Sequence, residues 1–118
     1  MEVGEKINAK ECSSRLGHIS DSLYVIGGKW KLPVIVALRE GSKRFNEIQR
    51  TVEGISARVL SSELKELELN GFVKRTVHTQ TPVVVEYEIT AYADTLNDVL
   101  NALSAWGAMH RNTLKNHR

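Results

Sequence analysis

The sequence predicts one α+β domain that is mostly helical. Over most of the chain, apolar residues recur at spacings of three and four, as they do on one face of an α-helix. Between residues 72 and 89 this spacing gives way to β-branched and aromatic residues in rough alternation with polar ones, which is typical of strands. The 118 residues suffice for one ordinary domain with one core. We therefore expect several helices packed with a single β-hairpin.

Two helices are predicted in the first forty residues. A helical stripe that ends at Gly27-Gly28 marks the first and consists of Leu16, Ile19, Leu23 and Ile26. The second helix is expected over residues 29–40, with Pro33 near its first turn, where proline is tolerated, and with Gly41 as its stop. Residues 1–12 are polar and charged, and we expect them to form a flexible arm.

A pair of helices is expected over about residues 46–69. Asn46, with Gln49 three positions later, has the pattern of a capping box and opens a short helix. Ser56 caps a longer helix that runs to Leu69 and ends at Asn70-Gly71. The apolar stripe of this helix consists of Leu60, Leu64 and Leu67. Two helices joined by a short turn that contains glycine form a helix-turn-helix candidate.

The remaining elements are a hairpin and a long last helix. Strands over 72–77 and 83–89 are joined by the turn-like segment His78–Pro82. Thr90 caps a helix over about 90–111, and residues 112–118 form a tail. In a domain spanning 13–111, this order of elements is typical of a winged helix-turn-helix in which the hairpin over about 72–89 is the wing.

Charge is unevenly distributed along the chain. The net charge is only +2, but residues 29–78 carry ten basic and six acidic side chains, and the segments on either side each carry three basic and four acidic ones. A basic segment in a nearly neutral chain fits a surface that binds a polyanion, although a solvated lysine-rich face explains the charge equally well. The longest apolar run has seven residues and no signal peptide is recognisable, so we expect a soluble cytoplasmic protein without a membrane partner.

The sequence contains no recognisable catalytic or metal-binding motif. The one cysteine and the four scattered histidines match no ligand spacing, so we expect neither metal nor cofactor. No glycine-rich phosphate loop, nucleophile elbow or paired catalytic carboxylates are present, and we expect the protein not to be an enzyme.

Several ordered motifs together resemble one family. The chain is similar to the HxlR-type bacterial transcriptional regulators, a branch of the MarR-like winged-helix proteins, over about residues 12–107. The matching strings are Ile26-Gly27-Gly28-Lys29-Trp30-Lys31, Arg44-Phe45-Asn46-Glu47-Ile48, Gly54-Ile55-Ser56, Leu60, Leu64-Lys65-Glu66-Leu67-Glu68, Gly71-Phe72-Val73, Val85-Glu86-Tyr87 and Trp106-Gly107. The resemblance implies a DNA-binding regulator, most simply a homodimeric repressor on a pseudo-palindromic operator. The strand after Pro82 departs from the family, since Val83-Val84 stand where an arginine is usual, and we expect a weak wing contribution.

The second helix of a helix-turn-helix reads the major groove through its first turns. The candidate residues of that helix are Ser56, Ala57, Arg58, Ser61, Ser62 and Lys65. Candidates for contacts of the wing and with the DNA backbone are Lys43, Arg44, Lys74, Arg75, His78 and Gln80, and only one of the adjacent Lys74 and Arg75 should point at DNA because strand side chains alternate. Two alternatives are the polar outer face of a core helix and a winged helix that binds protein without binding DNA.

The first and last helices are expected to form the dimer interface, through Leu16, Ile19, Leu96, Leu100, Leu103 and Trp106. The alternative is that this stripe completes the monomer core. Some members of the resembled family sense electrophiles or oxidants through a cysteine just before the first helix, where Cys12 lies, and a helix N-terminus favours thiolate. Cys12 is therefore a candidate redox sensor, with a small buried hydrophobe as the alternative role, and another small effector stays open.

Overall fold

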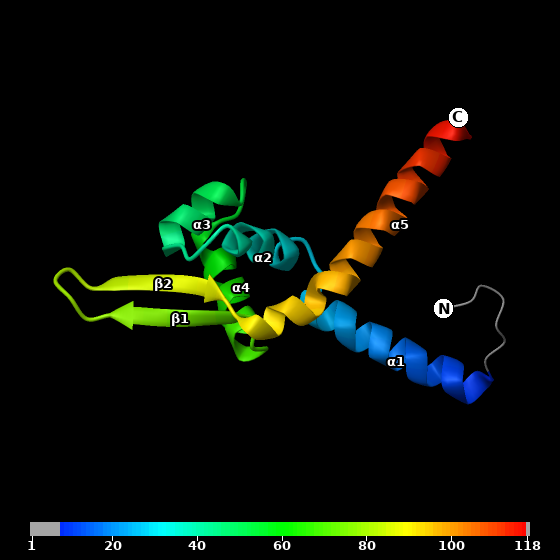
Figure 1. Cartoon of the computed structure of the whole chain (residues 1–118), viewed down its shortest axis with the longest axis horizontal. Coiled ribbons are helices and arrows are strands. Elements are labelled where there is room, and N and C mark those ends of the chain that lie inside the picture. Colours follow the sequence, from blue (N-terminus) through cyan, green and yellow to red (C-terminus); the bar gives the residue numbers. More distant parts are fainter. Residues whose placement is uncertain (1–7, 118) are drawn as a thin grey trace.

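The computed structural model describes residues 8–117, and its elements follow the predicted order from the blue N-terminal helix to the red C-terminal one (Figure 1). They are α1 (Ala9–Ile26), α2 (Lys31–Arg39), α3 (Phe45–Thr51), α4 (Ala57–Leu69), β1 (Val73–His78), β2 (Val84–Ile89), the 3-10 helix η1 (Ala91–Leu96) and α5 (Asn97–Asn116). The α+β, mostly helical class and the winged helix-turn-helix arrangement are confirmed. Among the described residues, no helix is both long and apolar enough to cross a bilayer.

The core lies within a body made of α2, α3, α4, the hairpin and η1. Its most deeply buried large side chains are Ile35, Leu38, Ile48, Leu60, Leu64, Leu67 and Val34. The predicted apolar stripe of α4 is thus confirmed as a core stripe. Every buried hydrophobic side chain among the described residues lies between Ile26 and Leu96, so the body holds the hydrophobic core.

The hairpin is antiparallel and pairs Val73 with Ile89 and His78 with Val84. A third, very short strand segment adds to it: the N–H of Lys43 donates to the carbonyl oxygen of Tyr87 at 2.9 Å, and the N–H of Tyr87 donates to that of Lys43 at 2.8 Å. No sequence pattern predicts this bridge, because a single residue pair leaves no period-two alternation. It fixes the segment before α3 to the root of the wing.

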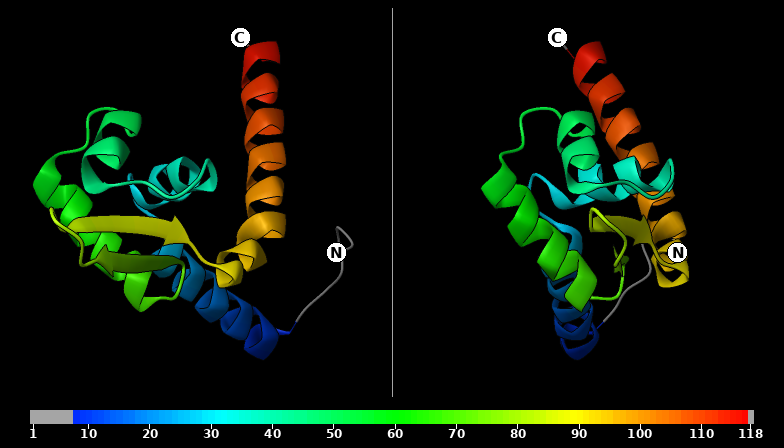
Figure 2. Two further views of the ribbon diagram at one scale, coloured as in Figure 1. Left: turned by 60° about the vertical axis from the view of Figure 1, so that its left-hand side comes forward. Right: turned by 90° about the vertical axis from the view of Figure 1, so that its left-hand side faces the viewer.

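Two helices extend away from the body as diverging arms. In Figure 1 α1 and α5 leave the body on the side opposite the hairpin, and the left view of Figure 2 shows α5 standing clear of it. The last helix differs from the prediction at both ends, because η1 precedes α5 and α5 continues to Asn116 through the expected tail; residue 118 lies outside the described residues. None of the residues 97–116 is buried.

Two predicted helix starts were wrong. Asn8 Oδ1 accepts a hydrogen bond from the Glu11 N–H at 2.8 Å, so α1 begins at Ala9 and the expected arm over 1–12 cannot reach Cys12; residues 1–7 of that arm lie outside the described residues. In α3 the cap is Arg44 rather than Asn46, since the Arg44 N–H donates to Glu47 Oε1 at 2.9 Å. In both cases a carboxamide or carboxylate three residues away satisfies a backbone N–H at the helix start.

Candidate nucleic-acid interface

Helix α4 turns one face to the core and the opposite face to solvent. Its buried side carries Leu60, Leu64 and Leu67, none more than 2% exposed. Arg58, Ser62 and Lys65, at spacings of four and three, lie on the exposed side. A guanidinium fork, a hydroxyl and an ammonium therefore follow one another along the outer face, and these groups can hydrogen-bond to base edges and phosphate oxygens.

The start of α4 is held by the predicted cap. Ser56 Oγ accepts a hydrogen bond from the Val59 N–H at 3.2 Å, so that hydroxyl is engaged in the helix cap. Ala57 is exposed beside it, whereas Ser61 is half-buried and lies away from the outer face. Of the six residues predicted for this helix, all but Ser61 are exposed, and among the exposed ones only the Ser56 hydroxyl is engaged in the cap.

The turn between α3 and α4 positions the second helix against the first. Gly54 has φ of +89°, a left-handed conformation that favours glycine, and buried Ile55 anchors the turn in the core. Gln49 Nε2 in α3 donates to the Ile55 carbonyl oxygen at 3.4 Å, so the side chain expected to cap α3 instead ties it to the turn. The turn is thus fixed from both sides.

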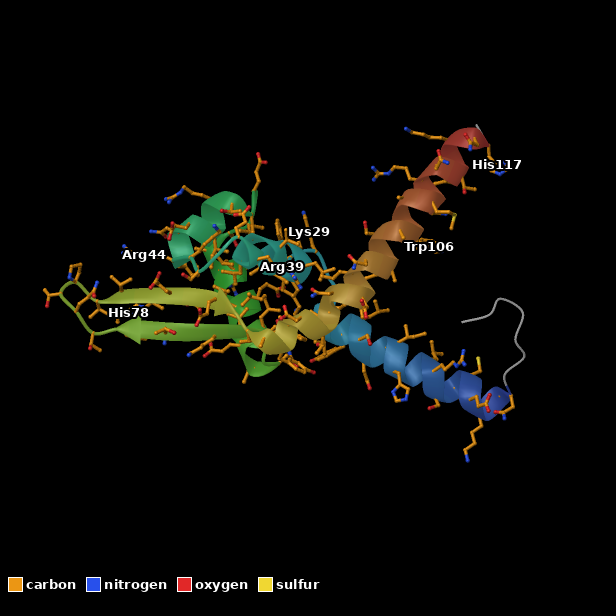
Figure 3. The ribbon with its side chains drawn as sticks, in the orientation of Figure 1. Lys29, Arg39, Arg44, His78, Trp106 and His117 are labelled. Carbon is orange, nitrogen blue, oxygen red and sulfur yellow. The ribbon has the colours of Figure 1, made fainter. Side chains whose placement is uncertain are left out.

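The cations around α3 differ in exposure and in whether a carboxylate is paired with them. Arg44 is exposed at the start of the helix (Figure 3), while half-buried Lys43 forms an ion pair with Glu40 at 3.1 Å. Lys43 is consequently a poorer candidate for a phosphate contact than the sequence indicated. Arg50, in the last turn of α3, is an exposed cation that the sequence analysis did not single out, since nothing in its neighbourhood distinguishes it from an ordinary surface residue.

On one face of the wing, basic side chains lie next to acidic ones. Lys74 and His78 alternate along β1 and share a polar hollow with Glu86 and Glu88 of β2. Lys74 is directly opposite Glu88, and His78 Nε2 is 2.8 Å from Glu86 Oε1. The basic side chains expected to face DNA from this side thus have carboxylates beside them. Arg75 is exposed on the other face of the strand, and Gln80 is exposed in the connecting turn.

A buried ion-pair cluster between α2 and α4 was not predicted. Lys31 Nζ lies 3.4 Å from both carboxylate oxygens of Glu63 and 3.4 Å from Glu66 Oε2. Lys31 was counted in the basic segment, but only 10% of its side chain is exposed. A lysine that opens an otherwise apolar helix, facing a helix with two glutamates one turn apart, was the available signal.

The arms carry a second exposed surface, which is apolar. In α1, Leu16, Ile19 and Leu23 are more than half exposed, as are Leu103 and Trp106 in α5 (Figure 3). Leu96, predicted for the same surface, is instead 8% exposed in the monomer core, and Leu100 is partly buried against that core. The structure therefore splits the predicted dimer residues, because the helix starts inside the body and then leaves it.

Cys12 is exposed, and it lies within α1 rather than before it. Its N–H donates to the Asn8 carbonyl oxygen at 2.9 Å, which makes it the fourth residue of the helix. Four residues before Leu16, it lies on the same side of α1 as the apolar stripe. Within residues 8–117 no group of three or more histidine, cysteine, aspartate or glutamate side chains is arranged to hold a metal ion.

Comparison with known proteins gives one consistent result. The family model described as HxlR-like helix-turn-helix matches residues 25–115. The HTH-type transcriptional regulator YtcD of Bacillus subtilis is 42% identical to this chain over 80% of this chain and 75% of its own length. A solved structure of ytcD superimposes with a TM-score of 0.74 at 41% identity, covering 80% of this chain and 96% of the other.

Two of the other similar solved structures are regulators in their reduced forms. The redox regulator HypR in its reduced form is 39% identical, with a TM-score of 0.73 over 83% of this chain and 97% of HypR. The reduced form of the transcriptional regulator YodB from B. subtilis is 37% identical, with a TM-score of 0.69 over 75% of this chain and 87% of YodB.

Proposed function

The chain belongs to the HxlR-like helix-turn-helix family of transcriptional regulators, and we propose that it binds double-stranded DNA sequence-specifically as a homodimeric repressor. The observation that carries this proposal is the exposed face of α4 with Arg58, Ser62 and Lys65, backed by a fully buried leucine stripe. A helix held so firmly presents its outer side chains at fixed positions, as reading a major groove requires.

The chemistry of each side chain indicates whether it would contact a base or a phosphate. Arg58, in the first turn, has the fork that forms two parallel hydrogen bonds to guanine, and Ala57 beside it can contact a thymine methyl group. Lys65 is two turns into the helix and suits a phosphate, as does exposed Arg44 at the start of α3. We propose only weak contacts from Lys74 and His78, since Glu88 and Glu86 lie beside them.

The direct test is selection of bound duplexes from random DNA, followed by measurement of affinity for a selected and an unrelated sequence at several salt concentrations. Enrichment of a two-fold symmetric motif is expected, together with a steep loss of affinity as salt rises. Binding that neither selects a sequence nor depends on salt would contradict the proposal and favour the alternative, a winged helix that contacts only protein.

Arg58 provides the sharpest residue-level test. Arg58→Ala should weaken binding to the selected sequence by roughly 1–3 kcal/mol and relax its preference at one base position. Arg58→Lys is the matched control, because it keeps the charge and loses the fork. A base-reading role requires Arg58→Ala to lose that preference; if Arg58→Ala weakens binding to the selected and the unrelated duplex equally, Arg58 contacts only phosphate. Full affinity in Arg58→Lys would show that the charge is sufficient and the fork is not required.

The homodimer is supported by the exposed apolar stripes of the arms. Leu16, Ile19 and Leu23 of α1 and Leu103 and Trp106 of α5 would stay in contact with water in a single chain. Exposed apolar surface of this kind is typical of a protein–protein interface, and a second copy with the same stripes would cover it symmetrically. Two copies would place two α4 helices on successive major grooves, which accounts for a pseudo-palindromic operator.

A thiol switch at Cys12 is a second proposal, supported by its exposed position at the end of the α1 stripe. The solved regulators HypR and YodB, described above in reduced forms, favour testing it first among effectors. In one form of the switch, diamide takes two electrons and two protons from two Cys12 thiols, one per protomer, and an intersubunit disulfide forms. In another, the thiolate adds to a quinone. Either change at the dimer surface would alter the spacing of the α4 helices.

Cys12→Ser tests the switch. Diamide or benzoquinone should weaken DNA binding by the wild-type protein and leave that of Cys12→Ser unchanged, and a non-reducing gel separates a disulfide from an adduct. Equal sensitivity of both proteins to these reagents would reject Cys12 as the sensor. We further propose that the protein has no enzymatic activity and acts in the cytoplasm, in keeping with relatives that are named transcriptional regulators.

A further inference from the structure

One buried cation lies in the contact between α2 and α4. The ammonium group of Lys31 lies at 3.4 Å from three carboxylate oxygens, two of Glu63 and one of Glu66. Only 10% of the Lys31 side chain and 14% of the Glu63 side chain are exposed, whereas Glu66 is 44% exposed. We name Lys31, Glu63 and Glu66 the α2–α4 clamp.

Burying the charges of the clamp is energetically unfavourable compared with an apolar contact between the same two helices. Burial removes the ammonium from water, and replacing buried ion pairs with apolar side chains of similar size is often neutral or stabilising. Lys31 is also the first residue of α2, where the helix dipole disfavours a positive charge. An apolar residue here would avoid both costs, so stability alone gives no reason for the lysine.

The geometry of α4 supplies a different reason. Glu63 follows Ser62 in the chain and Glu66 follows Lys65, so each clamp carboxylate is about 100° around the helix from a residue of the exposed face. Holding both glutamates on one cation fixes the rotation of α4 about its own axis. The packing of the leucine stripe already limits that rotation, and the ion pairs add a directional constraint on one side of the helix.

We propose that Lys31 is a positioning residue that sets the orientation of α4 on DNA through Glu63 and Glu66. The inference rests on the proposed function, since it assigns a specificity role behind the DNA-reading face. Lys31 touches no base in this account. It acts by holding Arg58 and Ser62 at the angle from which they reach base edges, and by neutralising carboxylates that border the face.

The experiment compares three variants by their affinities for a selected and an unrelated duplex, at a temperature where circular dichroism finds each fully folded. Lys31→Met removes the cation and keeps the side-chain length. Lys29→Met is the matched control, because it removes the same charge from an exposed lysine just before α2 (Figure 3). The triple variant Lys31→Met/Glu63→Gln/Glu66→Gln has no buried charge left unpaired, and it keeps the test valid if Lys31→Met alone fails to fold.

We expect Lys31→Met and the triple variant to lose about tenfold in the ratio of selected to unrelated affinity, the effect of one mismatched base pair. Lys29→Met should weaken both affinities equally and leave the ratio unchanged. The triple variant, which is more positive than the wild type, should bind unrelated DNA at least as well as the wild type does.

Two results would overturn the clamp. One is a wild-type ratio in the triple variant, which would show that the charges serve only to satisfy each other. The other is a loss of ratio in Lys29→Met as large as in Lys31→Met, which would make net charge the cause. A wild-type protein that binds no duplex DNA would reject the proposed function and the clamp together, whereas either of the first two results leaves the proposed function intact.

Discussion

The body and the arms use the same sequence pattern for different purposes. In α4 the apolar residues at helical spacing, Leu60, Leu64 and Leu67, are at most 2% exposed. In α5 the residues Leu103 and Trp106 have the same kind of spacing and are 51% and 60% exposed. The difference lies in position, because α4 packs across the body while α5 leaves it after its first turn (Figure 1). An apolar stripe thus predicts that a face will be covered, and the tertiary structure determines whether the same chain can cover it.

Charges divide in a similar way between the two sides of α4. Arg58 and Lys65 face solvent, while Glu63 and Glu66 turn inward to Lys31. The net charge of the segment 29–78 therefore understates the separation of positive from negative on this helix. Two of the glutamates on α4, Glu63 and Glu66, are offset by Lys31, while Arg58 and Lys65 remain exposed.

The largest expected effect is a loss of stability from a substitution in the core of the body, compared with a matching substitution in an arm. Leu64→Ala should lower the free energy of unfolding by roughly 2–5 kcal/mol, because it leaves a cavity in the core. Leu103→Ala, which removes the same atoms from an exposed site, should change it far less at protein concentrations where the chain is monomeric. Urea unfolding followed by circular dichroism measures both. Equal losses at low concentration would mean that α5 belongs to the core after all.

The next largest effect is expected on dimerisation, from a substitution in an arm that leaves the core of the body unchanged. Leu103→Glu should weaken dimerisation by about 2 kcal/mol or more if this residue is central to the interface. Ala105→Glu introduces the same charge on the other side of α5 and is the control. Sedimentation over a range of concentrations gives the dimer affinity of each. A dimer equally stable in both variants would place the interface elsewhere.

A smaller effect distinguishes a residue that stabilises α4 from a residue that is proposed to contact DNA. Ser56→Ala removes the helix cap and should cost about 1 kcal/mol of stability. Ser62→Ala, at an exposed position on the same helix, should stay within about 0.5 kcal/mol of the wild-type stability and lower DNA affinity instead. Thermal unfolding and DNA titration of both variants test this contrast. A large stability loss in Ser62→Ala would mean that its hydroxyl supports the fold.

The smallest effect is expected in the wing. His78 and Glu86 form a partly exposed pair, and such pairs contribute at most about 1 kcal/mol. His78→Ala should therefore change the unfolding free energy by less than Ser56→Ala does, and should leave DNA affinity nearly unchanged because the imidazole already contacts Glu86. A marked fall in affinity, measured at low salt, would assign the wing a larger part in binding than its charge pairs indicate.

Local chemistry accounts for what could be predicted. The end of α4 at Asn70-Gly71 and its cap at Ser56 each depend on one or two neighbouring residues, and each is found as expected. The starts of α1 and α3 were missed for a related reason. Two capping patterns overlap near residues 44–49, and only the backbone geometry decides which one forms. Asn8 with Glu11 was a visible signal that the polar composition of the segment obscured.

The remaining errors concern residues distant in sequence. Nothing near Leu96 indicates that it packs into the body while Leu103 stays outside it. Likewise, Lys31 and Glu63 are separated by 32 positions, and the contact that removes Lys31 from the exposed basic surface has no local pattern. The pairing of Lys43 with Tyr87 is missed for the same reason.

Residue spacing and short motifs, which act over one or two helical turns, were sufficient to predict the order of the elements, the leucine stripe of α4, the polar face opposite it and the resemblance to a family of regulators. Only the folded structure shows which apolar residues remain exposed on the arms, which cations are exposed, and that Glu63 and Glu66 of α4 pair with Lys31 of α2. Such outcomes depend on which elements meet in space, and burial and ion pairing change the energy of a side chain only after they have met.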